Sequence, residues 1–266
     1  MNPLRFPKST THGADVLRVA TYNIHKGVRG VGPQKRLEIH NLVLGIEALD
    51  ADLVCLQEVR HFNHREARAF PDPHRGWPKA SQGEYLAPDG YQVAYRTNAI
   101  TPEGEHGNAL LSRWPMVGDP GHHDVSDHRF EQRGLLHVRL DWNGTAVHAI
   151  VAHLGLMHSS RVRQVERIAA FIQQHIPKDE CLVVAGDFND WGERLGAPMK
   201  ATGLRRAHVE GAAAARTFPS RMPLFSLDRI YTRGLHCIGT HVPRGPSWAR
   251  MSDHLPLVAE LALDAG

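Results

Sequence analysis

The same order of segments occurs twice in this chain, and it constrains the fold more than any other feature. In the first half, residues 16–24 are apolar and β-branched, which indicates a strand, and a glycine-marked break follows at residues 25–27. Apolar residues at three- and four-residue spacing between residues 35 and 50 predict a helix. Residues 52–57 then predict a short buried strand, with Glu58 at its end.

The second half repeats this plan. Residues 145–154 predict a strand, and a helical stripe over residues 162–176 follows, which the serine pair at 159–160 can cap. The buried strand predicted at residues 181–185 runs into the polar segment 186–189. Two halves of this kind favour an α+β protein in which two similar sheets pack face to face and polar residues gather at one end.

Further strand signals fill the space between these units. Asn143-Gly144 is a strong hairpin signal because both residues accept the positive φ of a tight turn. The stretch 60–90 is rich in His, Arg, Pro and Gly and predicts a long functional loop or an insertion. The other predicted strands are residues 91–95, 109–112, 135–142, 227–231, 238–242 and 255–263.

A chain of 266 residues with 42% apolar content can bury a large core within one domain. We expect an N-terminal extension over residues 1–15 and a single domain over residues 16–266. The formal charge of +3, from 31 basic and 28 acidic residues, does not by itself indicate a nucleic-acid-binding protein. A local basic surface is compatible with this total.

Location and redox state follow from what the sequence lacks. Residues 1–15 have no basic-then-apolar signal-peptide pattern, and no segment approaches the roughly 18 consecutive apolar residues of a membrane-spanning helix. We therefore expect a cytoplasmic protein without a transmembrane segment. The odd number of cysteines, all in apolar segments, predicts buried free thiols at Cys55, Cys181 and Cys237.

Several acids stand where predicted strands end, and a rigid strand end can position a carboxylate for metal-assisted chemistry. Glu58 is a candidate metal ligand, or else a solvated strand end or ion pair. The segment 186–190 offers two polar positions around Phe188, although an ordinary Asp/Asn turn would look alike.

Two further acids stand beside or within apolar strands. Asp253 and His254 precede the last predicted strand, where the acid can bind metal and the imidazole can contact phosphate or water. Asp228 interrupts an apolar strand and could hold a histidine in one tautomer or form an internal salt bridge. Each of these signals is weak when it is taken singly.

Taken in order along the chain, seven short motifs make a stronger case. They are TYNIH (21–25), LQEV (56–59), GNALLSR (107–113), VAHL (151–154), GDFN (186–189), LDRI (227–230) and SDHLP (252–256). Together they resemble the motif series of the endonuclease/exonuclease/phosphatase superfamily, also called deoxyribonuclease-I-like. The resemblance extends from about residue 16 to residue 263. It implies a four-layer αββα sandwich of two mainly antiparallel sheets packed face to face, with a metal site at one edge.

The resemblance also implies roles for individual residues. Asn23 and Glu58 match positions that form the Mg²⁺ site, with Asp253 near the same cation, and Mn²⁺ is a possible substitute. The matches to catalytic positions are Asp187 and Asn189, which orient water and phosphate, His153 and His254, which face the scissile phosphate, and Asp228, which pairs with His254.

Some positions fit the family less closely. Asn108 and Arg113 match a less fixed motif, and we expect them to contact substrate. Some DNA-repair members have a carboxylate where this chain has His25, which weakens an abasic-site endonuclease interpretation. Glu105 is a possible but weak match to the glutamate that supports the first histidine in pancreatic-type nucleases.

The function implied is a Mg²⁺-dependent hydrolase that cleaves a phosphodiester or phosphomonoester by direct attack of water. Substrate partners left open are nucleic acid and phospholipid or sphingolipid head groups, because loops decide substrate choice. The identity of the general base and endo- versus exo-action also stay open, and we expect a monomer. The alternative is a catalytically silent domain that binds phosphate ligands. Such a binder has no need for Glu58, Asp187, Asp253 and both histidines together.

Overall fold

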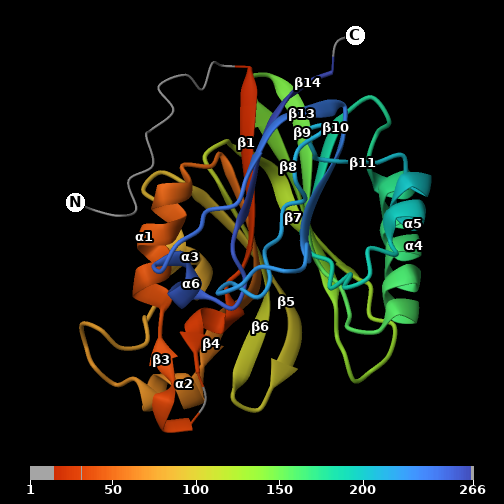
Figure 1. Cartoon of the computed structure of the whole chain (residues 1–266). Coiled ribbons are helices and arrows are strands. Elements are labelled where there is room, and N and C mark those ends of the chain that lie inside the picture. Colours follow the sequence, from red (N-terminus) through yellow and green to blue (C-terminus); the bar gives the residue numbers. More distant parts are fainter. Residues whose placement is uncertain (1–14, 31, 265–266) are drawn as a thin grey trace.

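Two six-stranded sheets pack face to face in the computed structural model, which describes residues 15–30 and 32–264, and helices cover the outer side of each sheet (Figure 1). The first sheet contains, in spatial order, β13 (Leu235–His241), β14 (Leu257–Leu263), β1 (Val16–Asn23), β4 (Leu53–Asn63), β6 (Gly104–Ser112) and β5 (Gln92–Thr101). The second contains β11 (Arg205–Arg206), β12 (Asp228–Arg233), β10 (Cys181–Asp187), β9 (Thr145–His153), β8 (Gly134–Trp142) and β7 (Met116–Asp124).

The pairing pattern is the same in both sheets. β1 runs parallel to β4, β9 runs parallel to β10, and the other neighbours are antiparallel. The chain is therefore an α+β protein with the expected four-layer αββα sandwich of two mainly antiparallel sheets. A small hairpin of β2 (Val28–Arg29) and β3 (Arg36–Leu37) stands apart from both sheets.

The helices of the outer layers differ in length. α1 (Ile39–Leu49), α3 (Gln82–Leu86) and α6 (Trp248–Met251) cover the first sheet, and α4 (His158–His175) and α5 (Gly196–Ala201) cover the second. The remaining helical elements are α2 (His64–Ala69) and two 3-10 turns at His25–Gly27 and Gly32–Gln34. None of the helices in the described residues is both long and apolar enough to cross a membrane.

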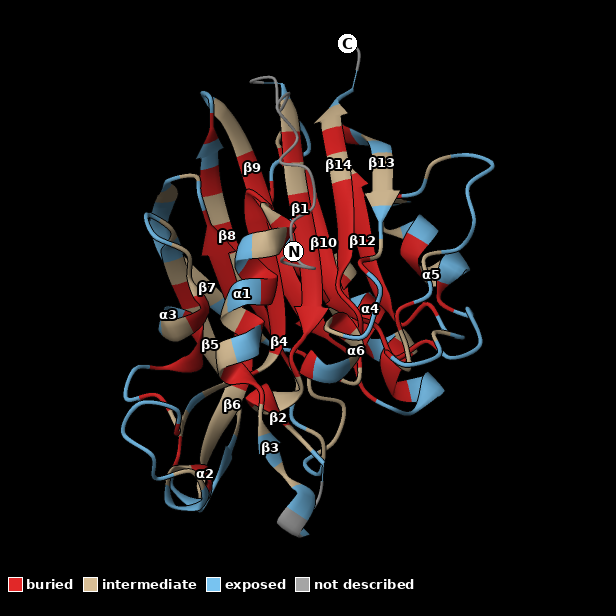
Figure 2. Ribbon diagram, turned by 60° about the vertical axis from the view of Figure 1, so that its left-hand side comes forward, coloured by how far each residue is buried: buried red, intermediate tan, exposed pale blue. Residues whose placement is uncertain are grey.

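Three hydrophobic cores separate the four layers. Alternation along each strand sends successive side chains into different cores, because neighbouring residues of a strand point to opposite faces. In β1, Leu17 and Val19 lie between the sheets, whereas Ala20 and Tyr22 pack under the outer helices. Figure 2 shows burial concentrated along the strands, with exposed residues in loops and on the outer helix faces.

Most predicted strands are confirmed with shifted ends, and the Asn143-Gly144 turn joins β8 to β9 with φ of 50° and 83°. The long loop expected over residues 60–90 was wrong in part, because β4 extends to Asn63 and α2 and α3 form within the segment. Helices of five or six residues carry no periodic apolar signal. Residues 1–14 of the expected N-terminal extension lie outside the described residues.

Two other local expectations need correction. The serine pair at 159–160 does not cap α4, whose N-cap residue is Met157, and the hydroxyl of Ser160 donates to Asp127 at 2.7 Å instead. β7 was missed because Gly118, Pro120 and Gly121 interrupt its pattern. The cysteines are free as expected, although Cys237 is only half buried.

The core between the sheets aligns the strands, so its packing should dominate stability. Leu110 of β6 is fully buried there, whereas Leu44 of α1 is 52% exposed. We predict that Leu110→Ala lowers the free energy of unfolding by about 2–5 kcal/mol because it leaves a cavity. Leu44→Ala, the matched control, should change it by less than about 0.5 kcal/mol. Urea unfolding measures both, and equal effects would contradict the assignment of this core.

Candidate active site

The polar residues singled out above lie mainly at one edge of the sandwich. Asn23 ends β1, His153 ends β9 and Asp187 ends β10. In the second sheet Asp187 is paired with His153 on one side and with Asp228, the first residue of β12, on the other. These residues continue the rows that face the other sheet, since Val151, Val183 and Ala185 of those rows belong to the core between the sheets. The site is therefore the polar end of that core.

Asn23 connects the two sheets at this edge. Its amide Nδ2 donates to Asp187 Oδ2 at 3.0 Å and to Glu58 Oε1 at 3.3 Å. The Oδ1 atom of Asn23 accepts from the backbone N–H of His25 at 3.0 Å. One buried amide is thus held by a carboxylate from each sheet, which fixes the distance between the two acids.

Glu58 reaches this edge because β4 contains a bulge. The pairing with β6 shifts between Leu56 and Val59, both of which point into the outer core under α1. Regular alternation does not put residues three apart on one face, so one residue in the segment is extra. Glu58 has a φ of 56°, a left-handed conformation that non-glycine residues rarely adopt. The expectation that Glu58 ends its strand is therefore corrected, since β4 continues to Asn63.

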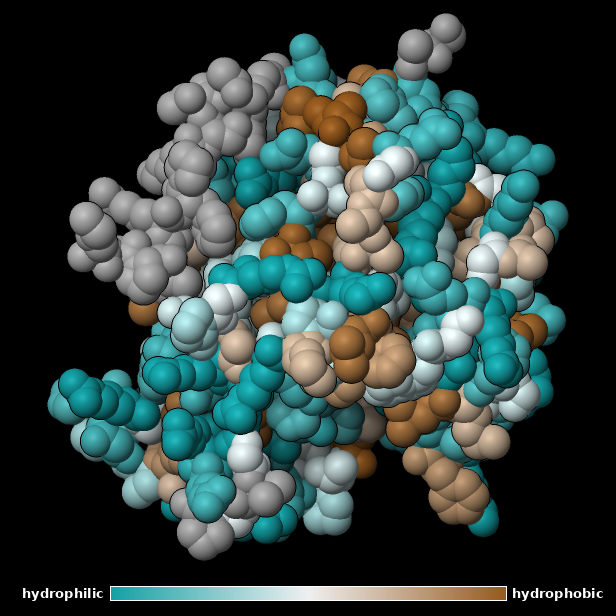
Figure 3. All heavy atoms as spheres, viewed as in Figure 1, coloured by the Kyte–Doolittle hydropathy of each residue, from teal (hydrophilic) through white to brown (hydrophobic). Residues whose placement is uncertain are grey.

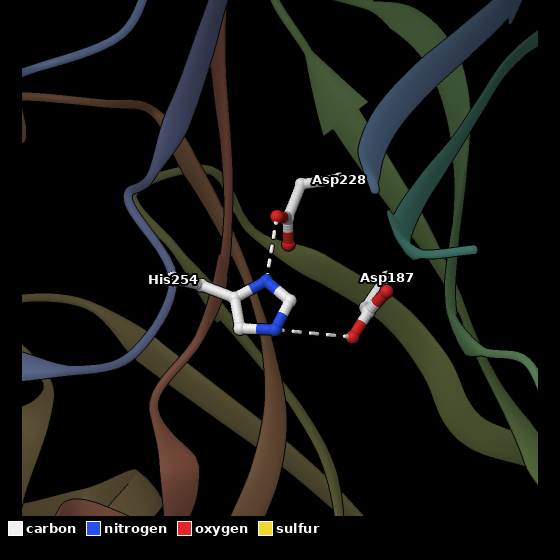
Figure 4. Close-up of side chains that lie close together, drawn as sticks. All are labelled: Asp187, Asp228 and His254. Carbon is white, nitrogen blue, oxygen red and sulfur yellow. Dashed lines mark hydrogen bonds and ion pairs between the residues drawn. The ribbon is translucent and has the colours of Figure 1, made fainter. Parts of the chain in front are cut away.

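His254 lies between two carboxylates (Figure 4). Its Nδ1 is 2.8 Å from Asp228 Oδ2, and its Nε2 is 3.6 Å from Asp187 Oδ2. The hydroxyl of Thr217 donates to the same oxygen of Asp228 at 2.6 Å. The structure thus gives Asp228 the place expected for it, beside His254.

The two imidazoles of the site have opposite electrostatic surroundings. Burial by itself lowers the pKa of His254, but the carboxylates of Asp228 and Asp187 outweigh it and raise that pKa well above its usual value. Burial and the nearby Arg133 lower the pKa of His153 to about 4, although Asp187 lies 3.6 Å from its Nε2. At neutral pH, His254 is therefore a cation and His153 is neutral.

The segment after Asp187 forms a tight turn around its carboxylate. The backbone N–H of Asn189 donates to Asp187 Oδ1 at 2.9 Å, and the side-chain amide of Asn189 donates to the carbonyl of Leu154 at 2.9 Å. Asn189 has a φ of 47°. Gly186 allows a close approach of β9 to β10, because a Cβ there would lie 1.8 Å from the carbonyl oxygen of Ala152.

Two basic side chains lie beside the expected metal ligands. The ammonium Nζ of Lys26 is 3.0 Å from Glu58 Oε2, and His25 Nδ1 is 3.3 Å from Asp253 Oδ2. Burial raises the pKa of Glu58, and attraction to His153, Lys26 and His25 lowers it by more. For Asp253, burial raises the pKa, and the hydrogen bond from His25 and the charge of His254 lower it by more. Both carboxyl groups are therefore ionised at neutral pH.

The two expected substrate contacts have different outcomes. Asn108 lies near the site on β6, where its amide donates to the carbonyls of Gly134 and Val151 in the second sheet, at 3.0 and 3.2 Å. Its buried Oδ1 has no hydrogen-bond partner among the described residues. Asn108 is thus a second bridge between the sheets, with one oxygen left for a ligand or water.

Arg113 is not at this edge. It follows the far end of β6, five residues beyond Asn108, which is about 17 Å along a strand. There its guanidinium pairs with Asp50 at 2.7 Å and Asp52 at 2.9 Å. The expectation that Arg113 contacts substrate is corrected, because motif order does not tell which end of a strand a residue occupies.

Sequence reasoning missed several supporting residues. Thr217 and Lys26 belong to segments without a recognisable pattern, and only the fold brings them to the site. Arg229 follows Asp228 and is buried against Asp190, with Nη1 2.9 Å from Oδ2. The adjacent opposite charges within two apolar segments, 186–190 and 227–230, were the signal that could have indicated this pair.

Asp187, Asp228 and His254 offer ligand atoms that all lie within 4.8 Å of one another, so this trio could hold a metal ion. Their hydrogen bonds favour another reading. An imidazole between two carboxylates is held protonated, and a protonated imidazole has no lone pair for a metal. Glu58 and Asp253 are the better ligands for a hard cation, since both are ionised and neither belongs to the hydrogen-bonded trio of Asp187, Asp228 and His254.

Comparison with known proteins agrees with this geometry. Residues 20–254 match the model of the endonuclease/exonuclease/phosphatase family. The chain belongs to this family. Its members are phosphoester hydrolases. The match covers all of the residues described above at the polar edge.

The proteins to which this chain is similar include one of about the same length and one that is much longer. The uncharacterized protein YbhP of Escherichia coli K12 is 37% identical over 254 residues, which cover 92% of this chain and 96% of that protein. Sphingomyelinase C of Leptospira interrogans is 33% identical over 168 residues, 58% of this chain and 28% of the longer protein. A solved endonuclease/exonuclease/phosphatase structure from Beutenbergia cavernae has a TM-score of 0.74 at 23% identity, covers 94% of this chain and 72% of that one, and shows the same fold.

The charge state of His254 can be tested by removing its partner. We predict that Asp228→Asn lowers the pKa of His254 because the largest attraction on its cation is lost. An NMR titration of the imidazole in metal-free protein measures it. Asp89→Asn, an exposed carboxylate, is the control and should leave that pKa unchanged.

The free energy of unfolding should also depend on the His254–Asp228 pair. A histidine whose pKa is raised on folding contributes stability in full below its unfolded pKa of ~6.5, and this is lost as pH rises through the folded pKa. The wild-type protein should therefore exceed Asp228→Asn in unfolding free energy by most at about pH 6, and by less at higher pH. A difference that does not change with pH would contradict this pairing.

Proposed function

We propose that the chain is a Mg²⁺-dependent hydrolase that cleaves a phosphodiester or phosphomonoester by direct attack of water. The observation that carries the proposal is the position of Asp187, whose Oδ2 lies 3.0 Å from the Asn23 amide and 3.6 Å from the Nε2 atoms of both His153 and His254. One carboxylate oxygen thus faces an amide donor, a neutral imidazole and an imidazolium. Such a set can accept a proton and stabilise developing negative charge in one place.

Each group then has a distinct part in the reaction. Asp187 orients the attacking water and takes its proton as the new phosphorus–oxygen bond forms and the bond to the leaving oxygen breaks. His254 cannot take this proton while Asp228 and Asp187 hold it as a cation, so it donates a hydrogen bond to a phosphoryl oxygen. The amide of Asn23 and the imidazole of His153 stabilise the same developing charge.

The donor set fits a divalent cation. Glu58 and Asp253 are ionised carboxylates, and the charge of Glu58 raises the pKa of Asp253, which is the repulsion that a cation removes. The Oδ1 atom of Asn23, which accepts from the backbone N–H of His25, is a further oxygen in this region. Oxygen ligands of this kind suit Mg²⁺, with Mn²⁺ as a substitute. The metal would polarise a phosphoryl oxygen, and the side chains of Lys26 and His25 would be free to contact phosphate.

Phosphoester cleavage is favoured over silent phosphate binding by the strain at the site. Among the described non-glycine residues with positive φ, four lie here: His25, Lys26, Glu58 and Asn189. Each such residue costs of order 1–3 kcal/mol, which a fold retains mainly where exact placement of a group matters. The sphingomyelinase relative supports a phosphodiester in a lipid head group as one candidate substrate. Nucleic acid is the other.

Turnover of bis-p-nitrophenyl phosphate with Mg²⁺ tests the proposal. We predict that Asp187→Asn and His254→Ala each lower kcat by roughly 10²–10⁴-fold, because each removes a group that acts on the transition state. His74→Ala and Asp89→Asn change exposed residues of the same types and should retain wild-type activity. Circular dichroism establishes that the variants are folded.

Metal dependence is tested with the same substrate. Chelation with EDTA should abolish turnover, and added Mg²⁺ or Mn²⁺ should restore it. Wild-type activity in both site variants would overturn the assigned roles. A folded wild-type protein that binds inorganic phosphate but cleaves neither diesters nor monoesters would support the silent domain instead.

A further inference from the structure

A second polar cavity lies beside the active site and contains an excess of positive charge. It has a volume of about 160 Å³. Four guanidinium groups and one carboxylate line it, from Arg29, Arg36, Arg221, Arg250 and Glu38. The carboxylate of Glu38 is buried and accepts from the side-chain amide of Asn41 at 2.7 Å. We call this cavity the arginine pocket.

The hairpin that forms one wall has an unfavourable charge arrangement. Arg29 of β2 and Arg36 of β3 are direct partners in the antiparallel register. Like charges in this position destabilise a strand pair. Arg221 and Arg250 add two further positive charges from other parts of the chain. An anion between the four groups would turn this repulsion into attraction.

Among the described residues, none of the four arginines forms an ion pair, and Arg29 alone has hydrogen-bond partners, which are backbone carbonyls. Within the part of the chain that the structure describes, the guanidinium groups of Arg36, Arg221 and Arg250 take part in no ion pair or hydrogen bond. Some other exposed arginines are paired, such as Arg163 with Asp127 at 2.5 Å and Arg113 with Asp50 at 2.7 Å. What distinguishes Arg36, Arg221 and Arg250 is that they line one concave site, where walls of low dielectric constant strengthen their field.

The arginine pocket shares a wall with the active site. Arg29 donates through Nη1 to the backbone carbonyls of Ala249 and Ser252. On the other side of this backbone, the Ser252 hydroxyl donates to the carbonyl of Asn23 at 2.7 Å. The N–H of Ser220, next to Arg221, donates to the carbonyl of Asp253 at 2.7 Å. Segment 252–253, which contains the proposed metal ligand Asp253, therefore contacts both Arg29 of the pocket and Asn23 of the active site.

The size and chemistry of the pocket suit a phosphate group. A cavity of about 160 Å³ has room for a group of five non-hydrogen atoms such as phosphate. Guanidinium groups bind phosphate oxygens through pairs of hydrogen bonds. Hydrophilic side chains cover the lower left of the molecular surface, where Figure 1 draws β3 (Figure 3).

We propose that the arginine pocket binds a second phosphate group of the substrate while the active site cleaves the first. This inference rests on the proposed function and narrows its substrate class to molecules with two phosphate groups. The second group could belong to a soluble bisphosphate or to a phospholipid. A neighbouring cavity of about 340 Å³, which shares Arg221 with the arginine pocket and is also lined by Pro223 and Leu255, offers an apolar wall for the rest of such a molecule.

The first experiment measures anion binding without catalysis. Isothermal titration of metal-free protein with inorganic phosphate at low salt should show binding in the wild type and in His254→Ala. The double variant Arg36→Gln/Arg250→Gln should bind about tenfold more weakly or not at all, because charge-assisted hydrogen bonds are lost. Its matched control, Arg65→Gln/Arg75→Gln, removes the same charge from other exposed positions and should bind as the wild type does.

The second experiment measures specificity. In Arg36→Gln/Arg250→Gln, KM should rise about tenfold or more for a bisphosphate, with kcat for bis-p-nitrophenyl phosphate unchanged. Glucose 1,6-bisphosphate represents the soluble source, and phosphatidylcholine vesicles with cardiolipin, which has two phosphate groups, or with phosphatidylglycerol, which has one, represent the lipid source and its control. The substrate for which KM rises in Arg36→Gln/Arg250→Gln, the soluble bisphosphate or the lipid, identifies the source of the second phosphate group.

Each failure has a separate meaning. Phosphate binding that disappears in His254→Ala but persists in the double variant would overturn the arginine pocket and assign the anion to the active site. Equal KM changes in the two double variants would overturn it as well. Phosphate binding lost only in Arg36→Gln/Arg250→Gln, in a protein without any hydrolase activity, would retain the pocket and reject the proposed function.

Discussion

The hydrogen bonds of Asn23 to Asp187 and Glu58 are the interactions on which the site depends, because they join acids from two different sheets. Bonds of an amide to a carboxylate contribute only about 1.5–3 kcal/mol each. They cannot align two six-stranded sheets by themselves. The apolar core between the sheets aligns them, and this alignment sets the positions of the polar residues at the edge. A change in sheet packing would therefore alter the catalytic geometry without touching a site residue.

The layered fold and most of the site could be predicted from the sequence, and the reasons are physical. Apolar alternation and the repeated strand, helix and strand order indicated two sheets, and motif order located Asn23, His153, Asp187 and His254. Register and backbone conformation could not be predicted in this way. The prediction for Arg113 was therefore wrong, since this residue lies at the end of β6 that is remote from the site. The bulge that turns Glu58 toward Asn23 depends on pairing with a strand some fifty residues away.

The two polar sites on either side of segment 252–253 have opposite electrostatic character. The active site concentrates carboxylates, with Lys26 beside Glu58 as a counter-ion and His25 beside Asp253. The arginine pocket concentrates cations that lack such partners. Cation binding on one side and anion binding on the other would each relieve repulsion that the protein alone retains. This arrangement accounts for local strain and unpaired charge that contribute nothing to the stability of the fold.

The central claim is that strand ends from both sheets form one pocket that holds a cation. The most direct measurement is the anomalous scattering of a crystal soaked in Mn²⁺. The account predicts a peak within bonding distance of the Glu58 carboxylate, on the side of Asn23 and Asp253. A peak between Asp187, Asp228 and His254 instead, or none at this edge of the sandwich, would contradict it.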